Sequence, residues 1–330
     1  MSHDHKTTRA LHAGLALLLL FAGQGCQKDS RGIPQSQSGS TRKTQIVLLG
    51  TGTPSPDPER SGPCTAIVVN GTPYLVDFGT GLVRRAAAAR KKGVEGLNPI
   101  NLKIGFLTHL HADHTLGFAD IVLTPWIMGR KEPLEVYGPQ GTQAMKEHIL
   151  KAYEADIKIR TEGLQRANKT GYKVNVHEIN PGVIYRDQNV TVTAFAVHHG
   201  EWPQAYGYRF DTPDRTIVVS GDTAADEAMS DHCHGCDVLI HEVYTQASFG
   251  LVPKEWQQYR LAYHTSSKQL AAIASKAKPG LLILCHRSNA GCDQVGTEEC
   301  RKAGSEEQLL KEIHQAYSGK VVAGHDLEVY

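Results

Sequence analysis

The chain has 330 residues, of which 40% are apolar, enough for one large domain or two modest ones with a sizeable core. Its formal net charge is +1, and loss of residues 1–25 would leave equal numbers of basic and acidic side chains. Proteins that bind many phosphates need a basic surface, so this balance argues against a dedicated nucleic-acid surface.

The first residues have the pattern of an export signal. Lys6 and Arg9 form a weakly basic start, and the apolar run Ala13–Gly23 is shorter than the about 20 residues that a membrane span needs. Cys26 stands where a bacterial lipoprotein would be cleaved and acylated; a plain secretory signal and a cytosolic protein are the alternatives. We therefore predict a signal over 1–25 and a periplasmic or cell-envelope protein, attached to the membrane only through a lipid on Cys26.

Residues 26–43 are polar and rich in Ser, Gln and Gly, which predicts a flexible tether before a domain at 44–330. Six cysteines remain beyond Cys26, an even count that permits disulfides in an oxidising compartment. The pair Cys233 and Cys236 has no second Cys-x-x-Cys partner, which favours a disulfide or unpaired thiols over a metal site. The pairing stays open.

Short β-rich runs alternate with helical ones after the tether. Strands are predicted at Gln45–Leu49, Thr65–Val69, Tyr74–Asp77, Ile104–Thr108, Leu134–Tyr137, Val174–Ile179, Val190–Val197, Tyr206–Phe210, Thr216–Ser220, Val238–His241 and Leu281–Cys285, with Val321–Tyr330 closing the sheet. Helices are predicted at Leu82–Lys92, Gly141–Ala155, Ser267–Ala277 and Ser305–Tyr317. Two strand-rich halves that each carry helices indicate one layered domain, with helices outside two central sheets.

The strongest functional signal is the segment His109-Leu110-His111-Ala112-Asp113-His114, which follows the apolar strand Ile104–Leu107. Imidazoles and a carboxylate suit zinc, and also iron or manganese. A histidine-rich surface loop is the alternative, but further candidate ligands recur downstream. Each of these follows an apolar strand, where a rigid scaffold presents active-site groups: His198-His199-Gly200, Ser220-Gly221-Asp222-Thr223 and Cys285-His286.

Together these motifs resemble the metallo-β-lactamase superfamily, and their spacing is similar to its ribonuclease Z-like and arylsulfatase-like branch. The resemblance runs from about Gln45 to the C-terminus, and four further segments share it: Leu49–Pro54, Val76–Gly79, His241-Glu242 and His264-Thr265-Ser266. It implies an α/β fold, the four-layer αββα sandwich of that superfamily. It also implies two divalent metal ions, zinc before others, and homodimers as a frequent assembly.

Carried over by residue, the resemblance implies two adjacent metal sites. Their expected ligands are His109, His111 and His199 for one metal, Asp113, His114 and His286 for the other, and Asp222 as the bridge. The Val-x-His-Gly pattern favours His199 over His198. Two cations about 3.5–4 Å apart would share a hydroxide and clamp the attacking and leaving oxygens. Asp113 would orient that hydroxide or take its proton.

Three other residues receive roles from the resemblance. His264 is expected to assist the leaving group, with a helix-entry histidine of structural use as the alternative. His241 and Glu242 are expected to orient ligands from behind. Alternatively, they are a buried polar pair.

The substrate is expected to be a small-molecule or nucleotide-like anionic ester, with phosphodiester hydrolysis first and sulfate-ester hydrolysis second. A thioesterase or lactonase and a non-catalytic metal-binding envelope protein are weaker alternatives. Transfer-RNA enzymes of this branch carry a long arm where this chain has only nine residues between Phe210 and Ser220. Arg60 and Arg287 are candidates for binding the anion, although a salt bridge would equally explain Arg287. Aromatics in Trp126–Lys131, Glu201–Pro203 and Tyr244–Trp256 are candidates for an apolar wall.

Overall fold

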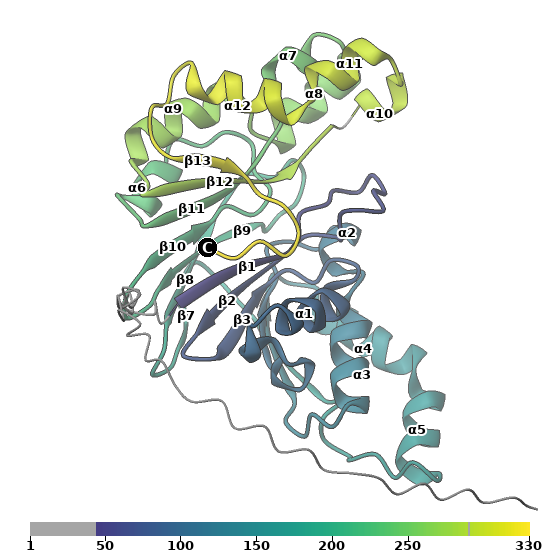
Figure 1. The fold of residues 1–330 in the computed structure, drawn as a ribbon. Coiled ribbons are helices and arrows are strands. Elements are labelled where there is room, and N and C mark those ends of the chain that lie inside the picture. The colour runs from purple at the N-terminus through teal and green to yellow at the C-terminus, as the bar shows by residue number, and fades with distance from the viewer. Residues whose placement is uncertain (1–43, 290) are drawn as a thin grey trace, which may run out of the picture. The chain divides into compact units, whose positions relative to one another are not determined.

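The computed structural model describes residues 44–289 and 291–330, so the predicted signal and tether lie outside the described residues. Two β-sheets pack face to face, and helices cover both outer faces (Figure 1). This is the predicted four-layer αββα sandwich. Within the described residues, no helix is both long and apolar enough to span a membrane.

The first sheet has the order β1-β2-β3-β4-β5-β6. β1, β2 and β3 pair as antiparallel neighbours, whereas β3 to β6 run parallel. The strands are β1 (Thr44–Gly50), β2 (Cys64–Val69), β3 (Thr72–Val76), β4 (Ile104–Phe106), β5 (Leu134–Gly138) and β6 (Val174–Glu178).

The second sheet has the order β13-β12-β11-β10-β9-β8-β7. Here β10 to β13 run parallel, and β7 to β10 are antiparallel. The strands are β7 (Gly182–Arg186), β8 (Thr191–Ala196), β9 (Tyr206–Asp211), β10 (Thr216–Val219), β11 (Val238–Val243), β12 (Leu281–Arg287) and β13 (Val321–Ala323).

Strand alternation divides the core into layers. In β1, Ile46 and Leu48 pack between the two sheets, whereas Val47 and Leu49 face the helices of the first half. Successive side chains of a strand point to opposite faces, so an unbroken apolar run fills two layers at once. A third layer packs α9 and α12 against the second sheet.

The helices of the first half are α1 (Leu82–Lys91), α2 (Ala112–Thr115), α3 (Phe118–Ile127), α4 (Thr142–Ala152) and α5 (Glu154–Glu162), with 3₁₀ turns at Glu95–Leu97 and Pro99–Asn101. Those of the second half are α6 (Met229–Cys233), α7 (Gln246–Phe249), α8 (Lys254–Tyr263), α9 (Ser267–Ala277), α10 (Cys292–Val295), α11 (Glu298–Ala303) and α12 (Glu306–His314). A capping box of Ser266 and Gln269 starts α9, which matches the predicted helix Ser267–Ala277.

Several elements depart from the sequence prediction. The predicted helix Gly141–Ala155 is two helices, because the chain turns at Tyr153, where φ is −100° and ψ is 11°. The helix α3 was not expected, since Pro125 interrupts its pattern. Trp126 of α3 is buried in the core of the first half, so it belongs to no pocket wall. The largely exposed edge strand β7 was not expected either, because its apolar run is only Val183 to Tyr185.

The C-terminal segment joins the two sheets. Only Val321–Ala323 extends the second sheet, so the predicted strand to Tyr330 is too long. Beyond it, Tyr330 exchanges backbone hydrogen bonds of 2.9 and 3.0 Å with Ile46 at the edge of the first sheet. The cysteines pair as Cys233–Cys236 and Cys292–Cys300, and the buried Cys64 and Cys285 are free thiols.

We expect Gly79→Ala to lower the free energy of unfolding by about 1–3 kcal/mol, the usual cost of overpacking. A Cβ on Gly79 would lie 2.1 Å from the carbonyl carbon of Gly62, so two backbone segments would have to separate. Urea denaturation of metal-free protein measures the change. Gly250→Ala is the matched control, because a Cβ there meets nothing within 4 Å. Equal stability of the two variants would contradict the close packing.

Candidate metal centre

The ligand-type side chains gather where strands of both sheets end. The segment from His109 to His114 follows β4, His199 follows β8, and Asp222 follows β10. His286 lies near the end of β12. Because β10 and β12 run parallel in the second sheet, the residues at their ends meet at one edge, and His114, which follows β4 of the first sheet, lies against Asp222 there.

Three imidazoles form the first cluster. His111 Nδ1 lies 2.9 Å from His109 Nε2 and 3.1 Å from His199 Nε2. The three ligand atoms all lie within 4.8 Å of one another, a spacing that one metal ion could fill. His198 is exposed to solvent, so the geometry selects its neighbour His199, as the sequence pattern favours.

A second cluster lies beside the first. Asp113 Oδ2 is 3.2 Å from His286 Nε2 and 3.4 Å from His114 Nε2. Asp222 Oδ2 is 3.5 Å from each of the same two nitrogens. Asp222 also falls within one ligand group with His109 and His114, so its carboxylate borders both clusters.

Electrostatics favour cation binding. Burial lowers the pKa of His109 and His111, and it lowers that of His199 to about 3, so these rings offer free lone pairs. Burial would lower the pKa of His114 too, but nearby carboxylates, Asp222 foremost, raise it well above the usual value. The same negative charges that stabilise a proton on His114 would stabilise a metal cation bound there instead. These residues therefore fit a divalent metal centre.

Asp77 orients His114 from behind. One carboxylate oxygen accepts from the Thr108 backbone N–H at 2.8 Å, and the other lies 2.8 Å from His114 Nδ1. This leaves Nε2 of the ring to face the cluster, where it has no hydrogen-bond partner among the described residues. Sequence reasoning noted the Val76–Gly79 segment but gave Asp77 no role, although an aspartate at a strand end was the available signal.

His199 is fixed by helix α8. Its Nδ1 donates to the Tyr263 carbonyl at 2.9 Å, so Nε2 faces His111. Gly200 follows with φ +56°, and a Cβ there would lie 2.0 Å from the Tyr263 ring, which explains the glycine after this histidine. The Trp202 indole nitrogen lies 2.8 Å from His111 Nε2, so this predicted aromatic does adjoin the cluster.

A β-bulge aims His286. Glu242 pairs with Cys285 and Val243 with Arg287, so His286 is the extra residue between them. Its φ is +41°, in the left-handed region that a histidine seldom adopts. The bulge turns the side chain out of the sheet and toward Asp113 and Asp222.

His264 and Glu242 form a buried pair at the pocket wall. His264 Nδ1 lies 3.3 Å from Glu242 Oε2, while Oε1 accepts the Thr265 backbone N–H at 2.8 Å. Burial by itself lowers the pKa of His264, but the charge of Glu242 outweighs it and the pKa is raised. The pair can therefore hold a proton at the edge of the site.

A cavity of about 440 Å³ opens above the two clusters. Its polar lining includes Asp113, Asp222 and three histidines. Its other walls come from the loop after β1 and from helices α8 and α10. The lining residues are Thr53, Pro54, Ser55, His111, Asp113, Asp222, Glu255, Trp256, Tyr259, His264, His286, Ser288 and Gln294. Trp256 and Tyr259 make this wall aromatic.

Comparison with known proteins places the chain in a family. Residues 72–287 match the family described as Beta-lactamase superfamily domain. The Ribonuclease Z of Mycobacterium bovis is 31% identical over 286 residues, which cover 86% of this chain and 96% of that protein. This chain belongs to the metallo-β-lactamase superfamily, in its ribonuclease Z-like branch.

Solved structures agree on the fold of this superfamily. The metallo-beta-lactamase fold protein YhfI from Bacillus subtilis aligns with a TM-score of 0.63 at 18% identity, covering 87% of this chain and 98% of that one. Human tRNase Z, short form, aligns with a TM-score of 0.61 at 20% identity and the same coverage. Family and relatives together make this superfamily member a metal-dependent hydrolase of ester bonds.

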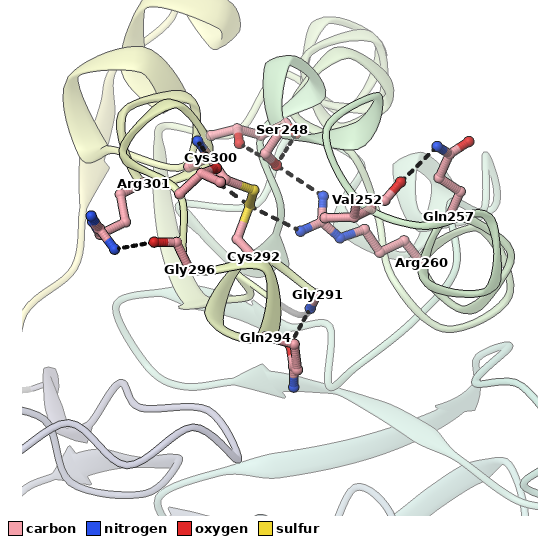
Figure 2. The surroundings of a disulfide bond; sticks show 12 residues. Ser248, Val252, Gln257, Arg260, Gly291, Cys292, Gln294, Gly296, Cys300 and Arg301 are labelled. Carbon is pink, nitrogen blue, oxygen red and sulfur yellow. Dashed lines mark hydrogen bonds between the residues drawn. A yellow bond between two sulfur atoms is a disulfide. The ribbon is translucent and has the colours of Figure 1, made fainter.

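The Cys292–Cys300 disulfide supports one wall of the pocket. Figure 2 shows the Cys292–Cys300 bond beside Arg260 of α8, whose Nη2 lies 4.0 Å from Cys292 Sγ and whose Nη1 donates to Ser248 at 2.9 Å. Gln294 accepts the Gly291 backbone N–H at 3.0 Å within the same turn (Figure 2). The bond thus ties the α10 turn, which lines the pocket, to α11.

Arg60 and Arg287 lie away from the metal clusters. Both line a neighbouring cavity of about 500 Å³ that shares Thr53, Ser55 and Gln294 with the metal pocket. Arg287 forms an ion pair with Glu306, which is the alternative that the sequence left open. Substrate contact by either arginine stays a prediction.

We expect Asp77→Asn to weaken zinc affinity by about 10–100-fold, the usual cost of losing a group that orients a metal ligand. In the variant, the new amide oxygen can still accept from the Thr108 N–H, and the amide NH₂ then faces His114 Nδ1. Nδ1 must then accept a hydrogen bond, so the ring proton moves to Nε2, the nitrogen that would bind the metal. Chelator competition measures the affinity. Asp187→Asn is the control, because Asp187 accepts only from residues remote from the site, Tyr74 and Tyr185 among them. Wild-type affinity in Asp77→Asn would contradict the orienting role.

Proposed function

We propose that this protein is a phosphodiesterase with two divalent metal ions, zinc before others. The observation that carries the proposal is the place of Asp222, which borders two separate ligand clusters. We assign one metal to His109, His111 and His199, the other to Asp113, His114 and His286, and the bridge to Asp222. When bound, two such ions activate a water molecule and neutralise charge on the ester oxygens.

The chain's own residues supply the proton transfers. Burial raises the pKa of Asp113, but the positive charges of His114 and His286 lower it further, so Asp113 is ionised and can accept a proton from the attacking water. His264 lines the pocket and is kept protonated by Glu242, so it can donate to the departing oxygen. The aromatic face of Trp256 and Tyr259 gives an ester group an apolar surface and excludes water from one side.

Phosphodiester substrates are favoured by the relationship to ribonuclease Z. For the same reason RNA is the second candidate, and the expectations of a small-molecule substrate and of no dedicated nucleic-acid surface have no support from the relatives. In favour of a nucleotide-like ester, β9 ends at Asp211 and β10 begins at Thr216, so no arm is inserted there. We further propose export, with Cys26 as lipid anchor, on the basis of the N-terminal sequence pattern.

We expect the zinc-loaded chain to hydrolyse bis-p-nitrophenyl phosphate and to release little from p-nitrophenyl sulfate or a β-lactam. Asp222→Ala should abolish turnover, because it removes the carboxylate shared by both clusters. Release of p-nitrophenol and β-lactam absorbance measure the rates, and a structured RNA precursor added to the panel tests the second candidate. Preferential sulfate release would overturn the proposal in favour of an arylsulfatase.

We expect His264→Ala to lower turnover by about 10²–10⁴-fold, as for loss of a general acid, while zinc content stays full. The loss should be larger for a diester with a poor leaving group than for the p-nitrophenyl ester. The wild-type rate should fall at high pH as His264 loses its proton. The pH–rate profile of the variant should not show this fall. His198→Ala, at an exposed histidine, is the matched control. Equal losses for both leaving groups would mean that His264 is only structural.

A further inference from the structure

Two buried ring nitrogens behind the metal clusters lack partners. Among the described residues, His241 Nε2 and His286 Nδ1 have no hydrogen-bond partner in the protein. Both residues are nearly solvent-inaccessible, on the neighbouring parallel strands β11 and β12. A buried polar atom without a partner costs about 1–3 kcal/mol, so each nitrogen requires an explanation.

The proton of His241 can be assigned. Its Nδ1 lies 2.7 Å from the Glu242 carbonyl oxygen, and a carbonyl can only accept, so Nδ1 carries the hydrogen. Burial lowers the pKa of the ring to about 4, and the ring is neutral. Its Nε2 therefore presents a lone pair and needs a donor.

The proton of His286 follows from its proposed role. Nε2 of this ring faces Asp113 Oδ2 at 3.2 Å and Asp222 Oδ2 at 3.5 Å, on the side where we place a metal ion. A ligating nitrogen offers its lone pair to the metal, so the hydrogen of the neutral ring is on Nδ1. This nitrogen therefore needs an acceptor.

A small cavity connects the two rings. Its volume is about 40 Å³, and both His241 and His286 line it, together with Glu242, Asp222 and Cys285. One water molecule needs about 10–15 Å³ of such space and two to four polar partners. The cavity has room for at least one water, and the two rings supply a donor and an acceptor.

We propose that one buried water occupies this cavity, accepting from His286 Nδ1–H and donating to His241 Nε2. The inference rests on the proposed metal role of His286. It makes His241 a positioning residue, which acts on the metal through the water and the ligand ring. The water keeps Nδ1 protonated, and so keeps the Nε2 lone pair directed at the metal.

Three variants of the full chain separate this role from a structural one. In His241→Asn the side chain can still donate to the Glu242 carbonyl but does not reach the position of Nε2. In His241→Gln it reaches that position and can still accept from the water. His241→Leu removes both functions. His148→Asn is the control, because His148 Nδ1 also bonds a backbone carbonyl, at 2.7 Å, but on the surface.

We expect His241→Asn and His241→Leu to weaken zinc affinity at the site assigned to Asp113, His114 and His286 by about 10–100-fold, measured by chelator competition without substrate. His241→Gln and His148→Asn should stay within a few-fold of the wild type. A high-resolution crystal structure of the zinc-loaded chain should show one water between the two rings. Equal affinities for Asn and Gln variants, or an empty cavity, would overturn the inference. A wild type that binds no zinc would instead overturn the proposed function.

Discussion

The burial of two carboxylates among imidazoles is the constraint on which the site depends. Asp113 and Asp222 lie within 3.5 Å of the same two histidine nitrogens, and their side chains are only 11% and 4% exposed. Burying a charge costs several kcal/mol unless an opposite charge compensates it. A proton on His114 supplies part of that compensation, and dications would supply more. The cluster is therefore understandable as a metal centre and hard to understand as a structural feature.

The fold holds Asp77 and His286 in backbone conformations that non-glycine residues seldom adopt. Asp77 and His286 both have positive φ, at +66° and +41°, and such residues cost of order 1–3 kcal/mol each. Both lie at the ends of strands that place alternate residues in the apolar layer between the sheets. The packed sheets thus hold both residues in these strained backbone conformations. In them Asp77 faces His114, and His286 faces Asp113 and Asp222.

The candidate ligands were predictable because each follows an apolar strand that is readable from sequence, and parallel strands end at a common rim. His199 was distinguished from His198 by the glycine that follows it. The groups behind the ligands were harder to foresee, because their partners come from tertiary contacts. The Tyr263 carbonyl that orients His199 belongs to α8, which was not predicted at all. Similarly, Trp126 is a core residue only because α3 packs against the first sheet.

The two ends of the pocket have different origins, and this bears on specificity. The candidate metal ligands and the groups that orient them come mostly from strand ends of the sandwich, so the proposed reaction depends mainly on the sheets. The aromatic wall of Trp256 and Tyr259 comes from α8, and Gln294 comes from the α10 turn held by the Cys292–Cys300 bond. These side chains can vary while the α8 backbone, including the Tyr263 carbonyl that orients His199, stays in place. We therefore expect the helical end of the pocket to select among esters.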